Sequence, residues 1–474
     1  MVFREAIKNS IFHEISNYCS ANNIESFVVG GYVRDFLLKR PSKDIDILII
    51  GDGIGVAKQI AKQIDPKIPV TIFKNFGTAY FKFNDYEIEF VGSRKESYAD
   101  DSRNPIIEAG SFKDDINRRD FKINSIAISL NKQNYGELID IHDGLMDLEQ
   151  KVINTPLDSN ITFSDDPLRM LRAIRFACQL DFEIHDNLVK TMSMQKNRIS
   201  IVTNERIVEE INKIILSKTP SKGFKILEQT GILEIVIPEL TSLKGIDEIE
   251  GQKHKDNFYH TLEVLDNICS NTDNLWLRWA ALLHDIGKAR TKNFNKKIGW
   301  TFHGHEFEGS KMVYKLFKRL RMPLNEKMKY VQKLVLMSSR PIVLAQENVT
   351  DSAVRRLIFD AGESVDDLMT LCEADITTKN KNRFKKYHDN FKIVREKIQT
   401  VEEKDNIRNF QPPISGAEIM STFNLKPCKT IGIIKETIKE AILEGEISNK
   451  YLDAFNLMKK KGSEMGLKPN ENKL

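Results

Sequence analysis

The sequence contains few cysteines and no long apolar run. Its 474 residues include 5 cysteines, which lie far apart and form no Cys-x-x-Cys pair. This pattern excludes a disulfide framework and a thiolate zinc site, and it is typical of a reducing compartment. No apolar run approaches the roughly 20 residues of a membrane-spanning helix, and the charged, amphipathic N-terminus is unlike a signal peptide. We therefore expect a cytoplasmic protein with no membrane partner.

A large excess of one charge is also missing. Lys and Arg total 71 against 67 Asp and Glu, which gives a formal net charge of +4. This balance excludes a polycation that is held to nucleic acid by bulk charge. The basic surplus is local, because residues 381–474 carry 19 basic and 13 acidic side chains. A mildly basic segment suits a polyanionic partner, but a solvated, Lys-rich helical surface has the same composition.

The length and the hydrophobic pattern indicate several domains in series. A mass of 54.5 kDa exceeds what one ordinary core accommodates. Apolar runs typical of strands occur at Phe27–Val29, Ile45–Ile50, Thr78–Phe83, Glu87–Val91 and Ile126–Leu130. From about residue 156 onward the pattern is almost wholly helical. We expect an α+β head over residues 1–155, a helical neck over 156–230, a third, helical domain over 245–380 and a helical tail over 381–474.

Two glycines follow the first strand-like run of the predicted head. The run Phe27–Val29 leads directly into Gly30 and Gly31, and a helix is expected after them. Glycine lets backbone N–H groups approach a phosphate, and a helix N-terminus favours the anion. Arg34 adds a guanidinium for phosphate oxygens, and Asp35 follows it. A simple tight turn between a strand and a helix is the alternative meaning of this pattern.

Two aspartates alternate with isoleucine in the second strand-like run. Asp44 and Asp46 are two positions apart, so on a strand their carboxylates project to the same face and repel one another. Such hard oxygen ligands beside substrate phosphates suit Mg²⁺. Paired ions of this kind activate an attacking hydroxyl and steady a leaving pyrophosphate. Glu89 is a candidate third carboxylate, with an exposed strand residue as the alternative.

The predicted neck helix carries regularly spaced charges. It starts near Asp165, and Asp166, Arg169, Arg172 and Arg175 recur every third residue. Cytosine and adenine each present an exocyclic amine beside an unprotonated ring nitrogen, whereas uracil and guanine reverse that pattern. One carboxylate and one guanidinium can therefore distinguish cytosine and adenine from uracil and guanine. Helix capping and a solvated basic face are the alternatives.

Five of the nine histidines fall within 52 residues, at His254, His260, His284, His303 and His305. His284 and Asp285 follow an apolar helical run, so this pair emerges from a buried face. His260 lies on the preceding predicted helix, and Asp375 lies on a later one. Imidazole and carboxylate ligands together suit Mn²⁺, Ni²⁺, Co²⁺ or Fe²⁺ more than Ca²⁺. The His-Gly-His loop is a candidate for a second ion, although such a loop is at least as often plain surface.

The order of these motifs resembles that of the class II tRNA nucleotidyltransferases, the CCA-adding enzymes. These belong, with bacterial poly(A) polymerases, to the polymerase-β-like superfamily. The segments that carry the resemblance are Gly30–Asp35, Asp44–Asp46, Arg118–Ile126 and Asp165–Arg169. The resemblance implies a polymerase-β-like head with a small mixed sheet and helices, followed by an all-helical neck, an HD domain and a tail.

The resemblance also implies roles for residues of the head and neck. Asp44 and Asp46 would hold Mg²⁺, while Asp166 and Arg169 would read the base. Asp165 stands where the family commonly has Glu. Further nucleotide-binding positions would be Gly30, Gly31, Arg34, Asp35, Arg118, Arg119, Asp120, Asn124, Arg172 and Arg175, with Asp120 and Asn124 shaping the sugar site.

The histidine segment resembles the HD phosphohydrolases. The resemblance implies a divalent ion such as Mn²⁺ or Ni²⁺ on His260, His284, Asp285 and Asp375, with His305 as a candidate for a second ion. Such an ion activates water to attack a phosphoester. A 2′,3′-cyclic phosphate or a 2′-phosphate at an RNA end is the family-like substrate.

The expected reaction is attack of the 3′-hydroxyl of tRNA on the α-phosphate of CTP or ATP. Residues 71–79 lack the Gly-Arg/Lys-Arg/Lys-Phe pattern of bacterial poly(A) polymerases, which favours CCA addition but does not separate it from CC-only or A-only addition. Residues 93–113 would be the family's flexible loop. Two alternative functions remain. The chain could be an HD phosphohydrolase with a non-catalytic RNA-binding head, or a catalytically silent RNA-binding protein.

Overall fold

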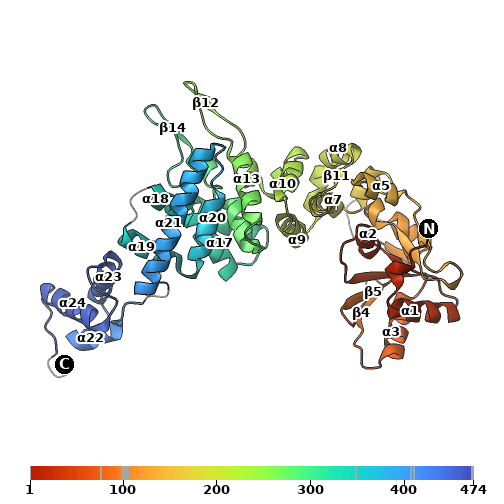
Figure 1. The fold of residues 1–474 in the computed structure, drawn as a ribbon, viewed down its shortest axis with the longest axis horizontal. Coiled ribbons are helices and arrows are strands. Elements are labelled where there is room, and N and C mark those ends of the chain that lie inside the picture. The colour runs from red at the N-terminus through yellow and green to blue at the C-terminus, as the bar shows by residue number, and fades with distance from the viewer. Residues whose placement is uncertain are drawn as a thin grey trace. The chain divides into compact units, whose positions relative to one another are not determined.

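The computed structural model describes residues 2–74, 77–97, 106–346, 350–405, 408 and 411–470. The chain divides into two compact units, Met1–Pro238 and Glu239–Leu474. The first unit contains a large sheet, and the second is mainly helical (Figure 1). The border between the units falls in the stretch 231–244, which separates the predicted neck from the predicted third domain.

A seven-stranded sheet forms the centre of the first unit, with the order β3-β4-β5-β2-β1-β8-β9. Its strands are β1 (Ser26–Val29), β2 (Asp44–Ile49), β3 (Thr71–Phe73), β4 (Thr78–Phe83), β5 (Tyr86–Gly92), β8 (Ala127–Ser129) and β9 (Leu138–Ile139). The pair β2 and β5 is parallel and the other neighbours are antiparallel. The mixed sheet that we expected is confirmed, and each of the five predicted apolar runs forms a strand.

Helices cover this sheet and continue into the neck. In the head they are η1 (Arg4–Ile7), α1 (Ser10–Ala21), α2 (Gly31–Leu37), α3 (Gly53–Ile64), α4 (Phe112–Asn117), η3 (Lys122–Asn124), η4 (Lys132–Asn134) and α5 (Gly144–Gln150). In the neck they are α6 (Ser159–Asp165), α7 (Leu168–Leu180), α8 (Asp186–Gln195), η5 (Lys196–Ile201), α9 (Asn204–Ile215) and α10 (Pro220–Gln229). The short helices α11 (Ile232–Val236) and α12 (Pro238–Thr241) follow in the stretch 231–244. Helix α7 follows Pro167, whose fixed φ suits a helix start, and it ends at Asp181 in the left-handed conformation.

The two faces of the sheet meet different environments. Ile47 and Phe90 are paired across β2 and β5 on one face, where both are fully buried and α3 packs on the neighbouring strands. The other face carries Val29 and Leu48 in a buried core. Asp46 precedes Leu48 by two residues, so strand alternation places its carboxylate on this second face. The core therefore borders directly on the predicted acidic site.

The segment 93–113, predicted as a flexible loop, contains regular structure. Strands β6 (Arg94–Ser97) and β7 (Ile106–Ala109) pair with each other in an antiparallel ladder. Residues 98–105, the middle of the predicted loop, lie outside the described residues. The loop prediction is wrong for the two strands, because charged residues fill β6 and its pairing depends on a partner that the local pattern does not reveal.

The second unit consists mainly of helices. They are α13 (Asn257–Cys269), α14 (Leu275–Leu283), α15 (Lys288–Thr291), α16 (His305–Arg319), α17 (Glu326–Met337), α18 (Arg340–Gln346), α19 (Asp351–Ala361), η6 (Gly362–Ser364), α20 (Val365–Ala374), α21 (Lys381–Asp405), α22 (Gly416–Phe423), α23 (Lys429–Glu444) and α24 (Tyr451–Glu464). Short strand pairs interrupt the helical pattern after residue 150, namely β10 (Val152–Ile153) with β11 (Glu183–Ile184), β12 (Glu248–Ile249) with β13 (Gln252–Lys253), and β14 (Asn293–Asn295) with β15 (Gly299–Thr301). Strands of two or three residues are too short for an alternating pattern to predict them.

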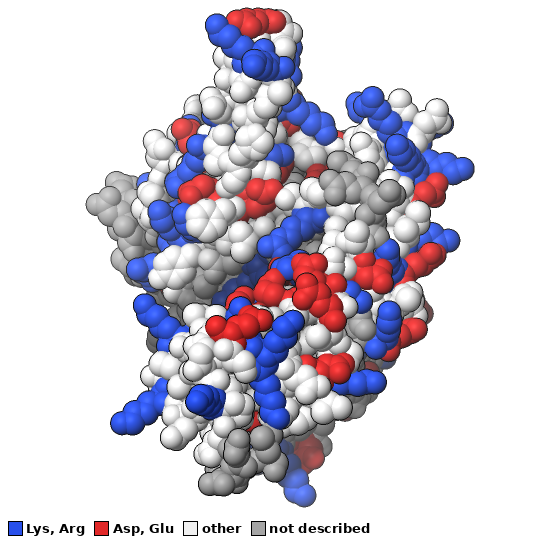
Figure 2. Space-filling model, turned by 90° about the vertical axis from the view of Figure 1, so that its left-hand side faces the viewer, with Lys and Arg blue, Asp and Glu red and all other residues white. Residues whose placement is uncertain are grey.

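Charged residues of both signs are scattered over the face of the molecule drawn in Figure 2. On the face drawn in Figure 2, acidic side chains gather near the middle, and Lys and Arg surround them. Glu440 and Glu444 of α23 pair with Arg356 of α19, so part of the acidic charge of the tail is neutralised within the second unit. Among the described helices, none combines the length and the apolar composition that crossing a bilayer requires.

Candidate active site and metal centre

The turn between β1 and α2 brings the backbone close to acidic and basic side chains of the head. Gly30 has a φ of +77°, a conformation that favours glycine. A Cβ added at Gly30 would lie 2.7 Å from Asp46 Oδ2 and 3.2 Å from Arg119 Nη1. Both backbone conformation and space therefore require a glycine here, next to the predicted acidic site.

Three carboxylates share one face of the sheet. Asp44 and Asp46 lie two positions apart on β2, and Glu89 of β5 is the register partner of Asp46. Asp44 is exposed, whereas Asp46 and Glu89 are half-buried. The fold thus brings the three acidic residues that the sequence singles out onto adjacent positions.

The ionisation of Asp46 reflects this crowding. Burial raises the pKa of Asp46 to about 6. The charge of Arg119 opposes the rise, while Glu89 and Asp44 add to it. Carboxylate oxygens that repel one another in this way are a donor set that suits a hard divalent cation. The residues therefore fit a Mg²⁺ site.

A continuous network of polar contacts joins α2 to the neck helix α7. Arg34 donates to Asp35 Oδ1 at 3.0 Å and to Asn124 Oδ1 at 2.8 Å. Asn124 donates to Asp120 Oδ1 at 3.0 Å, and Arg172 Nε donates to Asp120 Oδ2 at 2.8 Å. Burial alone would raise the pKa of Asp120, but the Arg172 charge and the Asn124 bond outweigh it and hold the pKa at about 2. Five predicted nucleotide-binding residues therefore support one another.

Asp115 organises two further arginines, and the sequence analysis missed it. Arg118 Nε donates to Asp115 Oδ1 at 2.8 Å, and Arg119 Nη2 donates to Asp115 Oδ2 at 3.0 Å. The Asp115 side chain is fully buried. A carboxylate three and four positions before two arginines is a helix-type ion-pair spacing, so the sequence did contain a signal for this role.

The three arginines of α7 have separate partners. Arg169 donates to the carbonyl oxygens of Thr162 and Arg118 at 3.3 and 2.7 Å. Arg175 Nε lies 3.2 Å from Glu210 Oε2 of α9, and the middle arginine belongs to the network described above. The arginines recur every three residues, which is less than the roughly 3.6 residues of a helical turn. The predicted stripe therefore drifts around the helix, and its members reach different neighbours.

Asp166 lies at the junction between α6 and α7. Its Oδ1 accepts a hydrogen bond from the backbone N–H of Leu168 at 3.1 Å. Asp165 is the last residue of α6. One of the two carboxylate oxygens of Asp166 is therefore engaged with the first residue of α7, although the N-cap position itself is Pro167.

A cavity of about 300 Å³ gathers many of these groups. Its lining consists of Gly30, Gly31, Arg34, Asp35, Ser42, Asp44, Asp46, Arg119, Asp120, Asn124, Arg172 and Phe176. Ser42 and Phe176 were not predicted. The Arg34 guanidinium lies 4.9 Å from the centre of the Phe176 ring, a cation–π distance that no local pattern indicates. Of the predicted residues, Glu89, Arg118, Asp166, Arg169 and Arg175 do not line this cavity.

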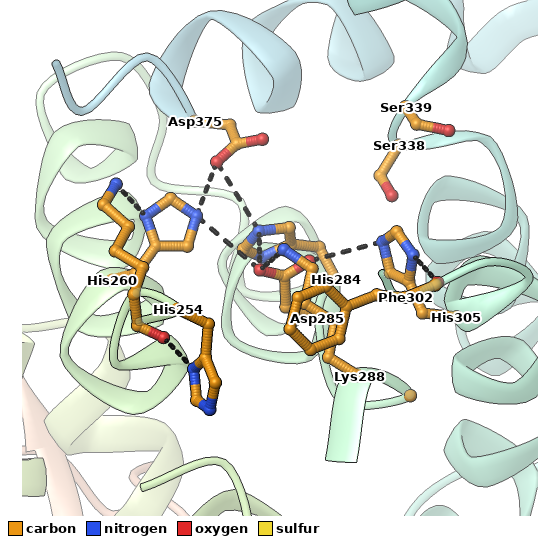
Figure 3. A network of polar contacts seen from close by, with 12 residues as sticks. His254, His260, His284, Asp285, Lys288, Phe302, His305, Ser338, Ser339 and Asp375 are labelled. Carbon is orange, nitrogen blue, oxygen red and sulfur yellow. Dashed lines mark hydrogen bonds and ion pairs between the residues drawn. The ribbon is translucent and has the colours of Figure 1, made fainter. Parts of the chain in front are cut away.

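Four groups from three helices converge in the second unit (Figure 3). His260 lies on α13, His284 and Asp285 follow α14, and Asp375 follows α20. His260 Nε2 is 2.8 Å from Asp375 Oδ1 and 3.6 Å from Asp285 Oδ2. His284 Nε2 is 3.4 Å from Asp285 Oδ2 and 3.7 Å from Asp375 Oδ1. The fold thus assembles the four residues of the predicted HD site, which we call the His/Asp cluster.

The outer nitrogens of the two rings are fixed by the surrounding backbone and side chains. His284 Nδ1 lies 2.8 Å from the carbonyl oxygen of Ala281, and His260 Nδ1 lies 3.2 Å from Thr377 Oγ1. Such bonds leave Nε2 as the atom that can bind a metal. His284 Nε2 is buried and forms no hydrogen bond with any described residue. Two Nε2 atoms facing two carboxylates fit a transition-metal ion.

The pKa values of His284, Asp285 and Asp375 depend on one another. Burial favours the neutral ring of His284, but Asp285 and Asp375 outweigh it and raise the pKa of His284 to about 10. In turn, the imidazolium of His284 holds the pKa of Asp285 well below its usual range, although burial alone would raise it. The pKa of Asp375 is also lowered, because the nearby rings of His260 and His284 outweigh the effect of burial.

His305 extends the cluster on the other side of Asp285. His305 Nε2 is 3.5 Å from Asp285 Oδ1, and His305 Nδ1 is 2.9 Å from the carbonyl oxygen of Phe302. Lys288, which was not predicted, places Nζ 2.6 Å from Asp285 Oδ2. The two oxygens of Asp285 therefore face different histidines.

The other two histidines of the segment have other surroundings. His254 Nε2 accepts the backbone N–H of Asp247 at 3.0 Å, and His254 Nδ1 lies 2.7 Å from the carbonyl oxygen of Lys255. Both ring nitrogens of His254 are therefore engaged outside the cluster. His303 is exposed on the loop before α16.

Three family models match the chain in the order of the motifs. The Poly A polymerase head domain matches residues 26–154. The Probable RNA and SrmB- binding site of polymerase A matches residues 181–244, and the HD domain matches residues 257–380. The three carboxylates of the head lie in the first matched region, and the His/Asp cluster lies in the third.

Curated relatives are similar over most of the chain. The Multifunctional CCA protein of Mannheimia succiniciproducens is 32% identical over 313 residues, which cover 63% of this chain and 71% of that protein. The A-adding tRNA nucleotidyltransferase of Aquifex aeolicus is 30% identical over 373 residues, which cover 73% of this chain and 44% of that protein. The chain thus spans less than half the length of the Aquifex relative.

Solved structures share the fold. The CCA-adding enzyme of Thermotoga maritima, determined in complex with tRNA, matches with a TM-score of 0.61 and 20% identity over 98% of this chain and 99% of that chain. At this identity the likeness concerns the fold. Together with the family models and the Mannheimia relative, it confirms the resemblance seen in the motifs. The chain belongs to the family of tRNA nucleotidyltransferases and poly(A) polymerases.

Proposed function

We propose that this chain completes the 3′ end of tRNA by template-independent addition of nucleotides from CTP and ATP. In each step the RNA 3′-hydroxyl oxygen forms a bond to the α-phosphorus, the bond to the β-phosphate oxygen breaks, and pyrophosphate leaves. The observation that carries the proposal is the meeting of Asp44, Asp46 and Glu89 on one sheet face beside a cavity lined with arginines.

A divalent cation belongs to this chemistry, as in the family's other nucleotidyltransferases. We assign Mg²⁺ to Asp44 and Asp46, with Glu89 as a third ligand, because the donor set consists of carboxylate oxygens alone. When bound, the ion would supply positive charge at the attacking hydroxyl and the leaving pyrophosphate. The conformation of Gly30 keeps the backbone close to these carboxylates.

The remaining residues of the cavity position the nucleotide. Arg34 and Arg119 offer guanidinium groups to the triphosphate. Asp120 and Asn124 are fixed by their mutual hydrogen bond and would meet the sugar hydroxyls. Arg172 pairs with Asp120 and is a further candidate for contact with phosphate.

Base selection is assigned to Asp166 and Arg169. A carboxylate accepts the exocyclic amine of cytosine or adenine, and a guanidinium donates to the adjacent ring nitrogen. Arg169 donates hydrogen bonds to two carbonyl oxygens. Reading the base therefore requires Arg169 to exchange at least one of these bonds for a bond to the base.

A gel extension assay tests this function. It uses a tRNA transcript that ends at the discriminator base and another that ends in CC, with Mg²⁺ and with each triphosphate alone and mixed. We expect growth by three nucleotides that needs CTP first and ATP second. Absence of any extension on both transcripts would refute the proposal.

A second candidate function within the same chemistry is addition of the terminal A alone. It is favoured by the relatives named A-adding tRNA nucleotidyltransferases, including the Aquifex protein. In the same assay an A-adding enzyme would extend only the CC-ended transcript, and it would need ATP alone.

The His/Asp cluster supports an accessory phosphohydrolase activity. We assign a transition-metal ion such as Mn²⁺ or Ni²⁺ to His260, His284, Asp285 and Asp375, with His305 near a second position. When bound, the ion would activate water. In hydrolysis of a 2′,3′-cyclic phosphate, the water oxygen bonds to phosphorus, one P–O bond of the ring breaks, and the released ribose oxygen takes up a proton.

The division of labour follows the predicted domains. We assign nucleotide transfer to residues 1–155 and 156–230, hydrolysis to 245–380, and contact with tRNA in part to the tail, 381–474. Phosphate contacts from the tail would make tRNA binding sensitive to salt.

A further inference from the structure

A second cavity, of about 520 Å³, opens beside the His/Asp cluster. Asp375 lines this cavity and also contacts both histidines of the cluster, so cavity and cluster share one wall. We propose that this cavity, the α21 cavity, holds the 3′-terminal nucleoside of an RNA while the terminal phosphate lies at the cluster. The inference rests on the proposed hydrolytic function of the cluster and names the part of the substrate that is recognised.

The walls of the α21 cavity suit a nucleoside. Tyr387 and Phe391 of α21 and Ile342 of α18 form an apolar and aromatic side. Phe391 is buried, whereas Tyr387 is half-buried and lines the opening. A volume of this size is typical of sites for small organic ligands, and a tyrosine ring is a surface on which any base can stack. A bare phosphate would not need such a wall.

The polar side of the α21 cavity suits the ribose and phosphate. Lys255 Nζ donates to Thr377 Oγ1 at 2.6 Å and lies 3.3 Å from His260 Nδ1. An ammonium group has three N–H donors, so Lys255 can keep its bond to Thr377 and also donate to an anion in the cavity that it lines. The ammonium group of Lys255 therefore lies both in the wall of the cavity and next to His260 of the cluster.

The start of α21 indicates that the nucleoside belongs to a nucleic acid and not to a free nucleotide. Residues 379–388 contain no acidic side chain. Their basic side chains, all exposed, are Lys379, Lys381, Arg383, Lys385 and Lys386. Phe384 is exposed and stacks with His388 at a ring distance of 6.4 Å. Basic residues interleaved with exposed rings are typical of single-stranded nucleic-acid binding, and Lys379 itself lines the α21 cavity.

Hydrolysis of paired substrates tests the nucleoside site. Tyr387→Leu and Lys255→Met are compared with wild type on cytidine 2′,3′-cyclic phosphate and on glycerol 1,2-cyclic phosphate, which has no base. We expect KM for the cytidine ester to rise at least about fivefold in Tyr387→Leu and KM for the glycerol ester to stay within about twofold. Lys255→Met should raise KM for both esters. Matched controls are Tyr314→Leu and Lys297→Met, at exposed positions of the second unit outside this cavity.

Binding of 3′-CMP gives a readout that does not depend on hydrolysis. Calorimetric titrations use the full chain carrying Asp44→Ala/Asp46→Ala, which removes metal-assisted binding in the head. We expect Tyr387→Leu to weaken 3′-CMP binding at least about fivefold while the bound metal, measured by mass spectrometry, stays equal to that of the parent. Equal affinity for 3′-CMP with and without Tyr387 would overturn the proposal.

The nucleic-acid part is tested with a five-nucleotide RNA that ends in a 2′,3′-cyclic phosphate. Lys385→Met/Lys386→Met should raise KM for this RNA and leave KM for the single cytidine ester unchanged. Equal effects on the two substrates would limit the site to a nucleotide and overturn the RNA assignment.

If wild type holds metal and hydrolyses both small esters equally well, the α21 cavity proposal fails while the hydrolytic function stands. If wild type holds no metal at the cluster, the hydrolytic function fails, and 3′-CMP binding alone decides the cavity.

Discussion

The acidic site of the head and the His/Asp cluster of the second unit surround their carboxylates with different groups. In the head, Asp44, Asp46 and Glu89 are neighbours of one sign, and burial raises the pKa of Asp46 to about 6. In the cluster, two carboxylates face two histidines, and Asp285 and Asp375 raise the pKa of His284. Carboxylates therefore crowd one another in the head, with Arg119 as an opposing charge, whereas each carboxylate of the cluster has imidazole neighbours.

This difference predicts a different ion for each site. Three carboxylates on adjacent positions suit a hard cation with oxygen ligands. A cluster that combines imidazole with carboxylate offers nitrogen and oxygen ligands, which suit a transition-metal ion. The two proposed sites should therefore differ in the metal that each prefers.

Metal removal should produce the largest effect and the clearest separation. After treatment with a chelator, we expect both nucleotide addition and phosphoester hydrolysis to be lost. Added Mg²⁺ should restore addition alone, because carboxylate oxygens select it, and Mn²⁺ or Ni²⁺ should be needed for hydrolysis. The measurement is each activity against each metal. Recovery of hydrolysis with Mg²⁺ alone would show that the two sites do not differ as proposed.

The second-largest effect should follow from removal of the carboxylates of β2. We expect Asp44→Ala/Asp46→Ala to lower the rate of CMP and AMP addition by about 10³-fold or more, equivalent to roughly 4 kcal/mol. The melting temperature should not fall, since burial of a crowded Asp46 opposes folding when the group is ionised. Asp85→Ala, in the exposed turn after β4, is the matched control. Wild-type rates in the double variant would rule out this metal site.

Much of the head could be predicted from the sequence, because its strands are apolar runs bounded by turns. The motif at Asp44 and Asp46 also fixed the face on which the site lies, since strand alternation is independent of the rest of the fold. The cluster was harder to predict. His260 and Asp375 lie on separate helices, and only the family resemblance related them before the structure placed them 2.8 Å apart.

Residues that act through tertiary contacts could not be predicted in the same way. Phe176 lies beneath Arg34, and Thr377 lies beside His260; neither has a local signature, because each depends on how distant helices pack. Asp115 is an intermediate case, since its spacing to two arginines was visible but its complete burial was not. Short charged strands such as β6 could not be predicted for a related reason: their pairing depends on a partner strand, which the local sequence pattern does not reveal.

Base selection should show an intermediate effect. We expect Asp166→Ala to reduce the preference for CTP and ATP over UTP and GTP by about 10- to 100-fold, the size of one or two lost polar contacts. The check is kcat/KM for each of the four triphosphates. Asp158→Ala, which removes the exposed cap of α6, controls for changes in helix stability. Unchanged selectivity would mean that Asp166 only caps α7.

The smallest expected effect is on the free energy of unfolding and its dependence on pH. The pKa of Asp120 is held at about 2 against an ordinary value of 3.8, so its ionised form stabilises the fold by about 2 kcal/mol at neutral pH. Because this pKa is lowered by folding, the contribution is present above about pH 4 and is lost as the pH falls toward 2. Asp120→Asn should therefore be less stable than wild type by about 2 kcal/mol at pH 7, with a gap that narrows in acid. Denaturant unfolding at pH 7, 4 and 3 measures the gap, and a constant gap would contradict the assigned cause.

The independence of the two sites is tested most directly by a crossed assay. Asp44→Ala/Asp46→Ala and His284→Ala/Asp285→Ala are each measured for extension of tRNA by CTP and ATP, for hydrolysis of cytidine 2′,3′-cyclic phosphate and for bound transition metal. The account predicts that the first variant loses extension and keeps hydrolysis and metal, while the second loses hydrolysis and metal and keeps extension. Loss of extension in the second variant, or normal extension in the first, would contradict it.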